Sequence, residues 1–412
     1  MIRMQQDFSK EKVKEVLRNL TYLIGDENRI LDMNWVMVRM PFDDKIIEFM
    51  SEISRKIMKK PEARKFPDVM AFGYWLRKSS LLELKRKFWM DQEDIRVGRG
   101  IAFHIAPSNV PVNFAYTLAV GLLTGNANIV RISSKNYPQV EIIYRAIEDA
   151  LREYPEFSAY LCLVRYDRSR EINDILSYLC DIRVIWGGDG TINELRKSPI
   201  RPRTNEITFA DRYSLAIIDS DKYLASNEKQ KVAEDFYNDT FYSDQNACTS
   251  PRLVIWTGNS IEEAKKVFWQ FEYALVEKKY QFQPIIGVNK LTDFCLLAVA
   301  EEGVNAVYGN DNRIVRVQVQ HLTNNLIEYR GSAGYFFEYD CADFMELKDF
   351  CNDNRCQTIG YFCDKEKIRP LLTAGIRGID RVVPIGRTME FDLIWDGMDL
   401  VEQMTRRIQI VE

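Results

Sequence analysis

The chain has 412 residues, of which 46% are hydrophobic, and a formal net charge of −4. This is the composition of an ordinary globular protein, and the length allows two domains that each bury a core. The charge gives no electrostatic case for nucleic acid, and no apolar run approaches the roughly 18 residues of a membrane span. Since the first residues lack the apolar segment of a signal peptide, we expect a cytoplasmic protein with eight reduced cysteines.

Apolar residues recur at helical spacing in the first 95 residues, for example at Ile46, Met50, Ile53 and Ile57. Nothing in this stretch carries a recognisable chemistry. We expect a helical layer that packs against the domain that follows it.

Short apolar runs alternate with helical patterns from residue 100 onward. We expect strands at 101–106, 128–132, 161–164 and 182–186, and helices at 111–122, 141–151 and 172–179, with Gly125 closing the first helix. This alternation predicts an α/β domain with a doubly wound parallel sheet. Such sheets bind ligands at the carboxyl ends of their strands.

Gly187 and Gly188 follow one of these strand ends and precede a helix expected to start near Ile192. Glycines there let a phosphate approach the backbone N–H groups of a helix start. The pattern is not the standard G-x-G-x-x-G. We interpret Asp189 as the N-cap of the helix.

Arg131, Ser133 and Ser134 end another strand and place a cation beside two hydroxyl groups. This combination suits a ribose phosphate, and a solvated loop explains it equally well. His104 lies on an apolar strand, where a buried and hydrogen-bonded histidine is expected. No metal site is expected, because the cysteines at 341, 351, 356 and 363 form no C-x-x-C pair and no histidine is near them.

Cys248 lies among small polar residues, directly ahead of the apolar run Leu253–Trp256. This predicts a turn or a helix start that leads into a buried strand, where backbone N–H groups can point at the thiol. A nucleophile and a small buried hydrophobe are both open interpretations. Further strands are expected at 215–219, 335–337 and 357–360.

Three separated motifs resemble those of the LuxC-type acyl-CoA reductases, which are part of the aldehyde dehydrogenase superfamily. They span 104–111, 247–251 and a closing block formed by 381–387, 391–392 and 395–397. The turn at 125–131, the two glycines and Cys248 follow in the order that the superfamily has. The resemblance implies an aldehyde-dehydrogenase-like α/β fold. The implied parts are a helical layer at 1–95, an NAD(P)-binding domain at 96–211, a catalytic domain at 212–380, and a segment at 381–412 that packs between domains or subunits.

The resemblance also implies roles for single residues. Cys248 matches the nucleophile, and Asn109 matches the side-chain donor of the oxyanion hole, with the backbone N–H of Cys248 as the second donor. The residues implied to bind the cofactor are Arg131, Ser133, Ser134, Gly187, Gly188 and Glu328. Among these, Glu328 stands where the family holds the nicotinamide ribose.

One departure from the superfamily bears on the reaction. Phe209 takes the place of the glutamate that activates the hydrolytic water in aldehyde-oxidising members, although a shifted alignment would bring in Asp211 or Glu206. The resemblance therefore implies an enzyme that reduces a fatty acyl thioester to the aldehyde through a cysteine acyl-enzyme. NADPH is the expected cofactor, since no carboxylate at Ser134 would repel a 2′-phosphate, and NADH is the alternative.

Other functions stay open on the sequence. They are an oxidative aldehyde dehydrogenase, an acyl-phosphate reductase, and a non-catalytic partner subunit, against which the presence of Asn109 and Cys248 argues. The acyl group could arrive on coenzyme A, on an acyl carrier protein, or on the cysteine of an acyl-activating synthetase. A homo-oligomer is expected.

Overall fold

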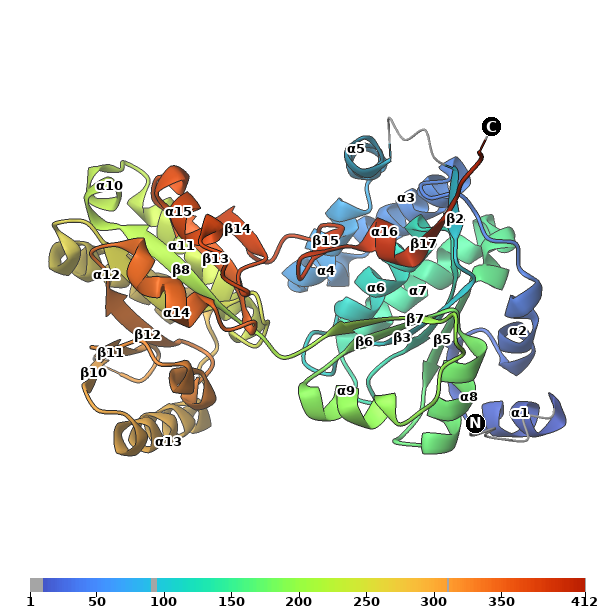
Figure 1. The fold of residues 1–412 in the computed structure, drawn as a ribbon, viewed down its shortest axis with the longest axis horizontal. Coiled ribbons are helices and arrows are strands. Elements are labelled where there is room, and N and C mark those ends of the chain that lie inside the picture. The colour runs from blue at the N-terminus through green and yellow to red at the C-terminus, as the bar shows by residue number, and fades with distance from the viewer. Residues whose placement is uncertain (1–9, 90–94, 310, 412) are drawn as a thin grey trace. The chain divides into compact units, whose positions relative to one another are not determined.

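The structure is a computed structural model that describes residues 10–89, 95–309 and 311–411. The chain divides into two compact units (Figure 1). Unit 1 comprises Met1–Ala210 and Phe391–Glu412, and unit 2 comprises Asp211–Glu390. No helix among the described residues has both the length and the apolar character needed to cross a bilayer.

Unit 1 is built around a sheet whose strands are joined by helical crossovers. The strand order is β1 (Thr21–Ile24), β5 (Leu161–Arg165), β4 (Ala127–Arg131), β3 (Ile101–Ile105), β6 (Ile182–Trp186) and β7 (Asn205–Phe209). Every neighbouring pair runs parallel except β1 with β5. The predicted α/β class and the four predicted strands are confirmed. The direction of winding reverses between β3 and β6, which is the position where such sheets bind ligands.

Helices cover both faces of this sheet. The crossovers are α6 (Asn113–Leu123), α7 (Pro138–Glu153), α8 (Arg170–Leu179) and α9 (Asp189–Arg196). Figure 1 shows α6 and α7 on one side of the sheet and α8 and α9 on the other. All five residues of β3 are buried, as expected for a parallel strand that is covered on both faces.

Several helix limits differ from those expected, since α7 begins three residues and α8 two residues earlier than predicted. Helix α6 begins at Asn113, two residues later than predicted, and it ends before Gly125, whose φ of +80° is the left-handed conformation of a closing glycine. Helix α9 begins at Asp189 rather than near Ile192, and Gly188 is its N-cap. The interpretation of Asp189 as the N-cap is therefore wrong. Its carboxylate lies in the first helical turn, where the helix dipole favours negative charge.

The segment before residue 90 forms the predicted helical layer. Its helices are α1 (Lys10–Leu17), α2 (Glu27–Asp32), α3 (Asp44–Lys59), α4 (Pro67–Trp75) and α5 (Lys78–Phe88). The stripe of Ile46, Met50, Ile53 and Ile57 on α3 is buried, and α3 packs on α7. The sequence did not predict β1, because a run of four residues is too short to show a periodicity.

Unit 2 contains a second, larger sheet. Its strand order is β10 (Val304–Tyr308), β11 (Val315–Val319), β12 (Tyr335–Asp340), β9 (Pro251–Thr257), β8 (Tyr213–Asp219), β13 (Cys356–Phe362) and β14 (Arg381–Pro384). Only the pair of β10 with β11 is antiparallel among the described strands of this sheet. The strands predicted near 215, 335 and 357 are confirmed.

Each face of this second sheet carries its own hydrophobic core. Successive residues of β9 alternate between them: Leu253 and Ile255 belong to one core, and Val254 and Trp256 to the other. The helices of the unit are α10 (Ser220–Ala225), α11 (Lys229–Thr240), α12 (Ile261–Lys279), α13 (Pro284–Ala300), α14 (Lys348–Cys351) and α15 (Arg369–Thr373). Continuous burial of β8 and β9 follows from this two-sided cover.

The closing block is divided between the units, since its residues up to 390 belong to unit 2 and the rest to unit 1. In unit 1 the block is anchored by aromatic rings. The ring of Phe391 stacks on that of Tyr116 with centroids 5.3 Å apart, and Tyr116 Oη donates to the carbonyl of Asp392 over 2.6 Å. Trp395 lies 5.4 Å from the same tyrosine ring. The Phe-Asp and Trp-Asp-Gly parts of the motif thus include packing residues of unit 1.

Candidate active site

Cys248 lies on a turn that precedes β9, and its side chain is half-buried. The turn starts with two residues in the left-handed region, Asp244 at φ +50° and Gln245 at φ +57°. Ser214 Oγ of β8 donates to the carbonyl oxygen of Cys248 over 2.7 Å. The predicted turn ahead of a buried strand is confirmed, and the alternative of a helix start is not found.

Cys248 differs from the other thiols in its accessibility. The buried cysteines are Cys162, Cys180, Cys341, Cys351, Cys356 and Cys363, and Cys295 is exposed on α13. Burial raises the thiol pKa to about 12 at Cys162, Cys180, Cys341 and Cys363. Such thiols hold almost no thiolate at neutral pH and act as packing groups. The interpretation of Cys248 as a fully buried hydrophobe does not fit its partial exposure.

The turn that carries Cys248 lies at the amino ends of the strands of unit 2. Strands β8, β9, β12 and β13 run parallel, so they all begin at this edge of the sheet. Asp211 lies two residues before β8, and Arg330 lies in the segment that leads into β12. These two side chains form an ion pair. Asp211, one of the two carboxylates considered as a base, is therefore held by an arginine.

Glu206, the other carboxylate considered, belongs to β7 of unit 1. Arg183 Nε and Arg196 Nε each donate to it over 2.8 Å. Burial by itself would raise the pKa of Glu206, but the hydrogen bonds from the two arginines outweigh it and lower that pKa. A carboxylate that is bound in this way is a poor general base.

Phe209 ends β7 and is almost fully buried, with 4% of its surface exposed. Its ring stacks on that of Trp186, with centroids 3.7 Å apart and an angle of 16° between the planes. Trp186 Nε1 donates to Thr117 Oγ1 over 3.3 Å, and this hydrogen bond fixes the indole ring on which Phe209 stacks. Phe209, which is predicted to take the place of the water-activating glutamate, is thus a fixed apolar ring that cannot accept a proton.

His104 is fully buried, as predicted. Its Nδ1 lies 2.7 Å from Thr117 Oγ1, and its Nε2 lies 3.0 Å from Asn128 Oδ1. Burial lowers the pKa of His104 to about 4, so the imidazole is neutral. Because the amide oxygen only accepts, Nε2 carries the proton and Nδ1 accepts from the threonine hydroxyl. His104 therefore organises the interior of unit 1.

Asn109 lies on an exposed bend that follows β3. Tyr137 Oη donates to the carbonyl of Ser108 over 2.9 Å and so ties this bend to the start of α7. Asn109 belongs to unit 1 and Cys248 to unit 2. Their cooperation in one oxyanion hole stays a prediction.

The two predicted phosphate-loop glycines lie between β6 and α9. Gly187 N donates to the carbonyl of Phe209 over 3.1 Å, and a Cβ at Gly187 would lie 3.2 Å from the side chain of Thr191. A Cβ at Gly188 would meet no atom within 4 Å. This open space beside the first turn of α9 fits a phosphate group, which backbone N–H groups and the helix dipole would stabilise.

The other predicted cofactor residues of unit 1 follow β4. The guanidinium of Arg131 lies 4.8 Å from the ring centre of Tyr166, and its buried Nε has no hydrogen-bond partner. Ser133 Oγ accepts from the backbone N of Lys135 over 3.2 Å, and Ser134 is exposed. An unpartnered buried donor and two hydroxyl groups fit the oxygens of a ribose phosphate.

Glu328 lies in a short 3₁₀ helix of unit 2, η5 (Asn324–Tyr329). It accepts from Arg355 Nη1 over 2.6 Å, and the same guanidinium donates to Asp353 over 2.9 Å. Its carboxylate is therefore part of an ion-pair chain at the amino edge of the sheet. Binding of a ribose by Glu328 stays a prediction.

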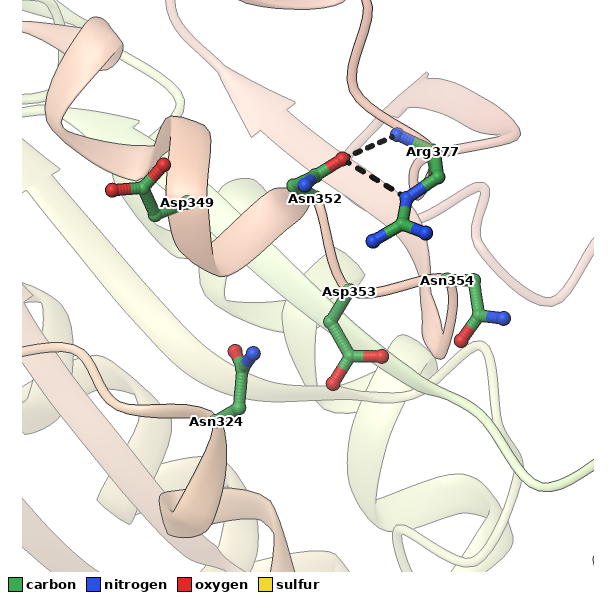
Figure 2. Close-up of a pocket in the computed structure, with 6 residues that line it drawn as sticks. All are labelled: Asn324, Asp349, Asn352, Asp353, Asn354 and Arg377. Carbon is green, nitrogen blue, oxygen red and sulfur yellow. Dashed lines mark hydrogen bonds between the residues drawn. The ribbon is translucent and has the colours of Figure 1, made fainter.

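A polar cavity of about 290 Å³ lies beside this ion-pair chain (Figure 2). It is lined by Asn324, Asp349, Asn352, Asp353, Asn354 and Arg377. Asn352 Oδ1 accepts from the backbone N of Arg377 over 3.2 Å and from its Nε over 3.4 Å. Cys248 does not line this cavity, and its polar walls do not suit an acyl chain.

The sequence did not predict the contacts between the closing block and the nucleophile turn. Asp239 of α11 accepts from Gly386 N over 2.6 Å and from Thr388 N over 3.1 Å. The next residue, Met389, places its Sδ 3.2 Å from the Oγ1 of Thr249, which directly follows Cys248 in the chain. Burial raises the pKa of Asp239 to about 7. The closing motif indicated that residues near Gly386 have a function, but their partner Asp239 on α11 is far away in the sequence and could not be predicted.

Comparison with known proteins agrees with the motifs. The family model described as acyl-CoA reductase (LuxC) matches residues 80–275, a range that includes both Asn109 and Cys248. A long-chain acyl-protein thioester reductase of Photorhabdus laumondii is 24% identical over 78% of this chain and 66% of its own length. The enzyme of the same name from Aliivibrio fischeri is 21% identical over 72% of this chain and 61% of its own length. The matches thus span slightly less than two thirds of these relatives.

Solved structures show the same fold. Glyceraldehyde-3-phosphate dehydrogenase GapN of Methanocaldococcus jannaschii, complexed with NADP, has a TM-score of 0.63 at 14% identity and covers 97% of this chain and 94% of its own. The indole-3-acetaldehyde dehydrogenase AldA of P. syringae, in complex with NAD⁺ and IAA, has a TM-score of 0.66 at 13% identity, with 97% and 87% covered. The aldehyde-dehydrogenase-like fold and the resemblance to the LuxC acyl-CoA reductases are both confirmed.

Proposed function

We propose that this protein is an NADPH-dependent reductase that converts a fatty acyl thioester to the aldehyde through an acyl-enzyme on Cys248. One observation carries the proposal. The half-exposed thiol lies on a fixed turn of an aldehyde-dehydrogenase-like unit, within the segment that matches the LuxC acyl-CoA reductases. The name of the relatives, long-chain acyl-protein thioester reductase, supports the same substrate class.

The chain's own groups account for the first half of the reaction. The Cys248 thiolate attacks the thioester carbonyl, and the carbonyl oxygen gains the negative charge of a tetrahedral intermediate. Asn109 Nδ2 and the backbone N–H of Cys248 are the donors that stabilise this oxyanion, typically by about 3 kcal/mol each. Collapse of the intermediate expels the carrier thiolate, which takes up a proton and leaves the acyl group on Cys248.

The second half returns the thiol to its starting state. A bound nicotinamide cofactor supplies the hydride that reduces an acyl carbonyl. The acyl-cysteine becomes a thiohemiacetal on Cys248, with Asn109 stabilising the oxygen. Collapse then breaks the carbon–sulfur bond, releases the aldehyde and regenerates the thiolate.

The proposed cofactor site uses the carboxyl edge of the unit 1 sheet. Gly187 and Gly188 would hold the pyrophosphate at the start of α9. Arg131, with the hydroxyls of Ser133 and Ser134, would hold the adenosine ribose, and the guanidinium favours a 2′-phosphate and hence NADPH. Glu328 would hold the nicotinamide ribose. The cofactors named for the similar structures support a nicotinamide cofactor in general.

Phe209 supports reduction over oxidation. Its ring is stacked on Trp186, and the two nearest carboxylates in sequence, Glu206 and Asp211, are bound by arginines. Without a general base the acyl-enzyme meets no activated water. It therefore remains available to hydride or to a returning thiol.

Mass spectrometry of the intact protein tests the proposal. After incubation with tetradecanoyl-CoA and no reduced cofactor, we expect one acyl group on Cys248 that is released by added thiol. Cys295→Ala, which removes the exposed thiol of α13, should acylate normally, and Cys248→Ala should not acylate. Absence of an acyl group on the wild-type protein, with coenzyme A, carrier protein and acyl-protein donors all supplied, contradicts the proposal.

Product analysis of the reverse reaction tests its direction. Aldehyde with NADP⁺ alone should give little free acid, and coenzyme A should restore turnover as acyl-CoA. Rapid formation of free acid without coenzyme A would contradict the reductase and favour an oxidative dehydrogenase.

The proposal has two further parts. The acyl group is delivered by a carrier protein or by an acyl-activating synthetase, and the chain assembles into a homo-oligomer.

A further inference from the structure

The base of the nucleophile turn is a buried glutamine. Gln245 is completely buried, three residues before Cys248. Its Nε2 donates to the carbonyl oxygens of Pro251 and Tyr335 over 2.9 and 3.1 Å. Its Oε1 accepts from Gly334 N and Tyr335 N over 3.0 and 3.2 Å. The amide thus uses both donors and both acceptor sites, and it joins the turn to the starts of β9 and β12.

A buried arginine completes this attachment. Arg252, the second residue of β9, is 8% exposed. Its Nη2 donates to the carbonyl oxygen of Gln245 over 2.5 Å, and its Nη1 donates to the carbonyl oxygen of Gly331. A Cβ at Gly331 would lie 2.6 Å from Tyr335, so the close approach of this backbone depends on glycine. Arg252 therefore binds the turn on one side and the segment before β12 on the other.

The charge of Arg252 is not used in an ion pair among the residues that the structure describes. Burial lowers the pKa of Arg252 to about 10, and the neighbouring Arg330 acts in the same direction. The groups that oppose this are Asp211, which is already paired with Arg330, and Cys248. The guanidinium of Arg252 is bonded to the carbonyl oxygen of Gln245, three residues before Cys248, so a buried positive charge lies at the base of the turn that carries the thiol. A cation in such a place favours a thiolate over a thiol.

We propose that Arg252 is the positioning residue of the nucleophile, which fixes the Cys248 turn through two backbone carbonyls and supplies the buried positive charge that favours the thiolate. A cysteine with an ordinary pKa near 8.5 is only roughly 3% thiolate at pH 7, whereas a nearby cation increases this share. Because Arg252 lies on a central strand, its charge keeps its place when substrate binds. The inference rests on the proposed function in that it concerns the same nucleophile.

The pH dependence of alkylation tests this inference without substrate. The full chain with Cys295→Ala is treated with iodoacetamide between pH 5 and 10, and the modified Cys248 peptide is quantified by mass spectrometry. In the otherwise wild-type protein the pH at which Cys248 alkylation reaches half of its maximal rate, its midpoint, should lie below 8.5. In Arg252→Gln it should rise by about one unit, a tenfold loss of thiolate at neutral pH. In Arg252→Lys it should rise by less than half of that, since the charge is kept.

Arg316→Gln is the control for loss of a partly buried arginine that does not contact the Cys248 turn. Arg316 lies in the same unit and pairs with Glu338 over 2.7 Å. We expect this variant to melt at a lower temperature and to keep the wild-type midpoint. A wild-type midpoint at or above 8.5 overturns the inference even if Arg252→Gln does not fold. An unchanged midpoint in folded Arg252→Gln overturns it as well.

Acylation separates this inference from the proposed function. At pH 7, Arg252→Gln should acylate about tenfold more slowly than the wild type, and at pH 9 it should regain most of the loss, because the thiol then ionises without help. A rate that stays low at pH 9 would make Arg252 a purely structural residue. If the wild type is never acylated but its alkylation midpoint is low and depends on Arg252, the proposed function fails and the inference stands.

Discussion

Both units contain a mainly parallel sheet covered by helices, yet their predicted functional residues lie at opposite edges of the sheet. In unit 1 the residues follow the strands: Asn109 follows β3, Ser134 follows β4 and Gly188 follows β6. In unit 2 the predicted nucleophile Cys248 precedes a strand, and Glu328 lies in the segment before another. The carboxyl edge offers helix starts with free N–H groups, which suit an anionic ligand. The amino edge offers loops that lead into strands, and buried side chains can fix these loops in place.

This difference has an energetic meaning. The open space at Gly188 needs little side-chain support, because the backbone and the helix dipole provide the binding groups. The turn of Cys248 begins with two strained left-handed residues, and Gln245, Arg252 and Ser214 hold it in place. Substitutions in unit 1 should therefore affect mainly binding, and substitutions in unit 2 mainly the chemical step. The following experiments sharpen or break this contrast.

Cys248→Ala should have the largest effect. We expect acylation and reduction to fall by more than about a thousandfold, because the proposed acyl-enzyme forms on this thiol. The affinity for NADPH, measured by fluorescence titration, should stay within about twofold of the wild type. Residual turnover above that level would place the nucleophile elsewhere and would remove the special role of the amino edge.

Asn109→Ala should come second. If Asn109 donates to the oxyanion, kcat should fall by roughly 10²–10³-fold with little change in KM. Ser108→Ala, on the same exposed bend, is the matched control and should behave like the wild type. A loss confined to KM would make Asn109 a binding residue, so that all of the chemistry would belong to unit 2.

The fold of unit 1 could be predicted well from the sequence, and the surroundings of the nucleophile could not. The alternation of apolar runs and helical stripes is local, so it revealed β3, β4, β5 and β6 directly. It missed β1, whose four residues carry no period, and it misplaced the start of α9, where Gly188 caps the helix without a side chain. Burial of His104 followed from its apolar strand.

The contacts of the Cys248 turn are of another kind. Gln245 binds Tyr335, Arg252 binds Gly331, and Asp239 binds Gly386, so each contact joins residues about 80 to 150 positions apart. Such pairs leave no periodic pattern in a single sequence. The family motif predicted Cys248 as the nucleophile, but only the packing of the strands revealed which residues hold its turn in place.

The free energy of unfolding should depend on pH with opposite signs in the two units. The folded state lowers the pKa of His104 from 6.5 to about 4, so the unfolded chain binds more protons between these values and stability falls as the pH drops from 6.5 to 4. The folded state raises the pKa of Asp239 from 3.8 to about 7, so the folded chain binds more protons and stability falls as the pH rises from 4 to 7. Each term amounts to about 3 to 4 kcal/mol over its whole window.

Hydrogen exchange can measure the two slopes in one protein. The chain is equilibrated in urea at each pH and labelled briefly at one fixed pH, and peptides from β3 and α11 are followed by mass spectrometry. His104→Gln should flatten the slope for the β3 peptide only, and Asp239→Asn that for the α11 peptide only. If both peptides respond to both variants, the chain unfolds as one cooperative body and the contrast in stability disappears.

The choice of cofactor should give the smallest effect, and it tests whether the carboxyl edge of unit 1 binds the adenosine ribose at all. Ser134 is exposed beside Ser133, and Arg131 has a buried donor without a partner. A glutamate at position 134 would accept hydrogen bonds from both hydroxyls of an unphosphorylated ribose and would repel a 2′-phosphate. We expect the ratio of kcat/KM for NADPH to that for NADH to exceed one in the wild type and to fall below one in Ser134→Glu, a change of about tenfold or more.

Ser134→Gln controls for size, since it adds the same length without charge and should keep the preference for NADPH. An unchanged ratio in Ser134→Glu would mean that the ribose binds elsewhere, and the likeness of this edge to a dinucleotide site would then rest on Gly187 and Gly188 alone.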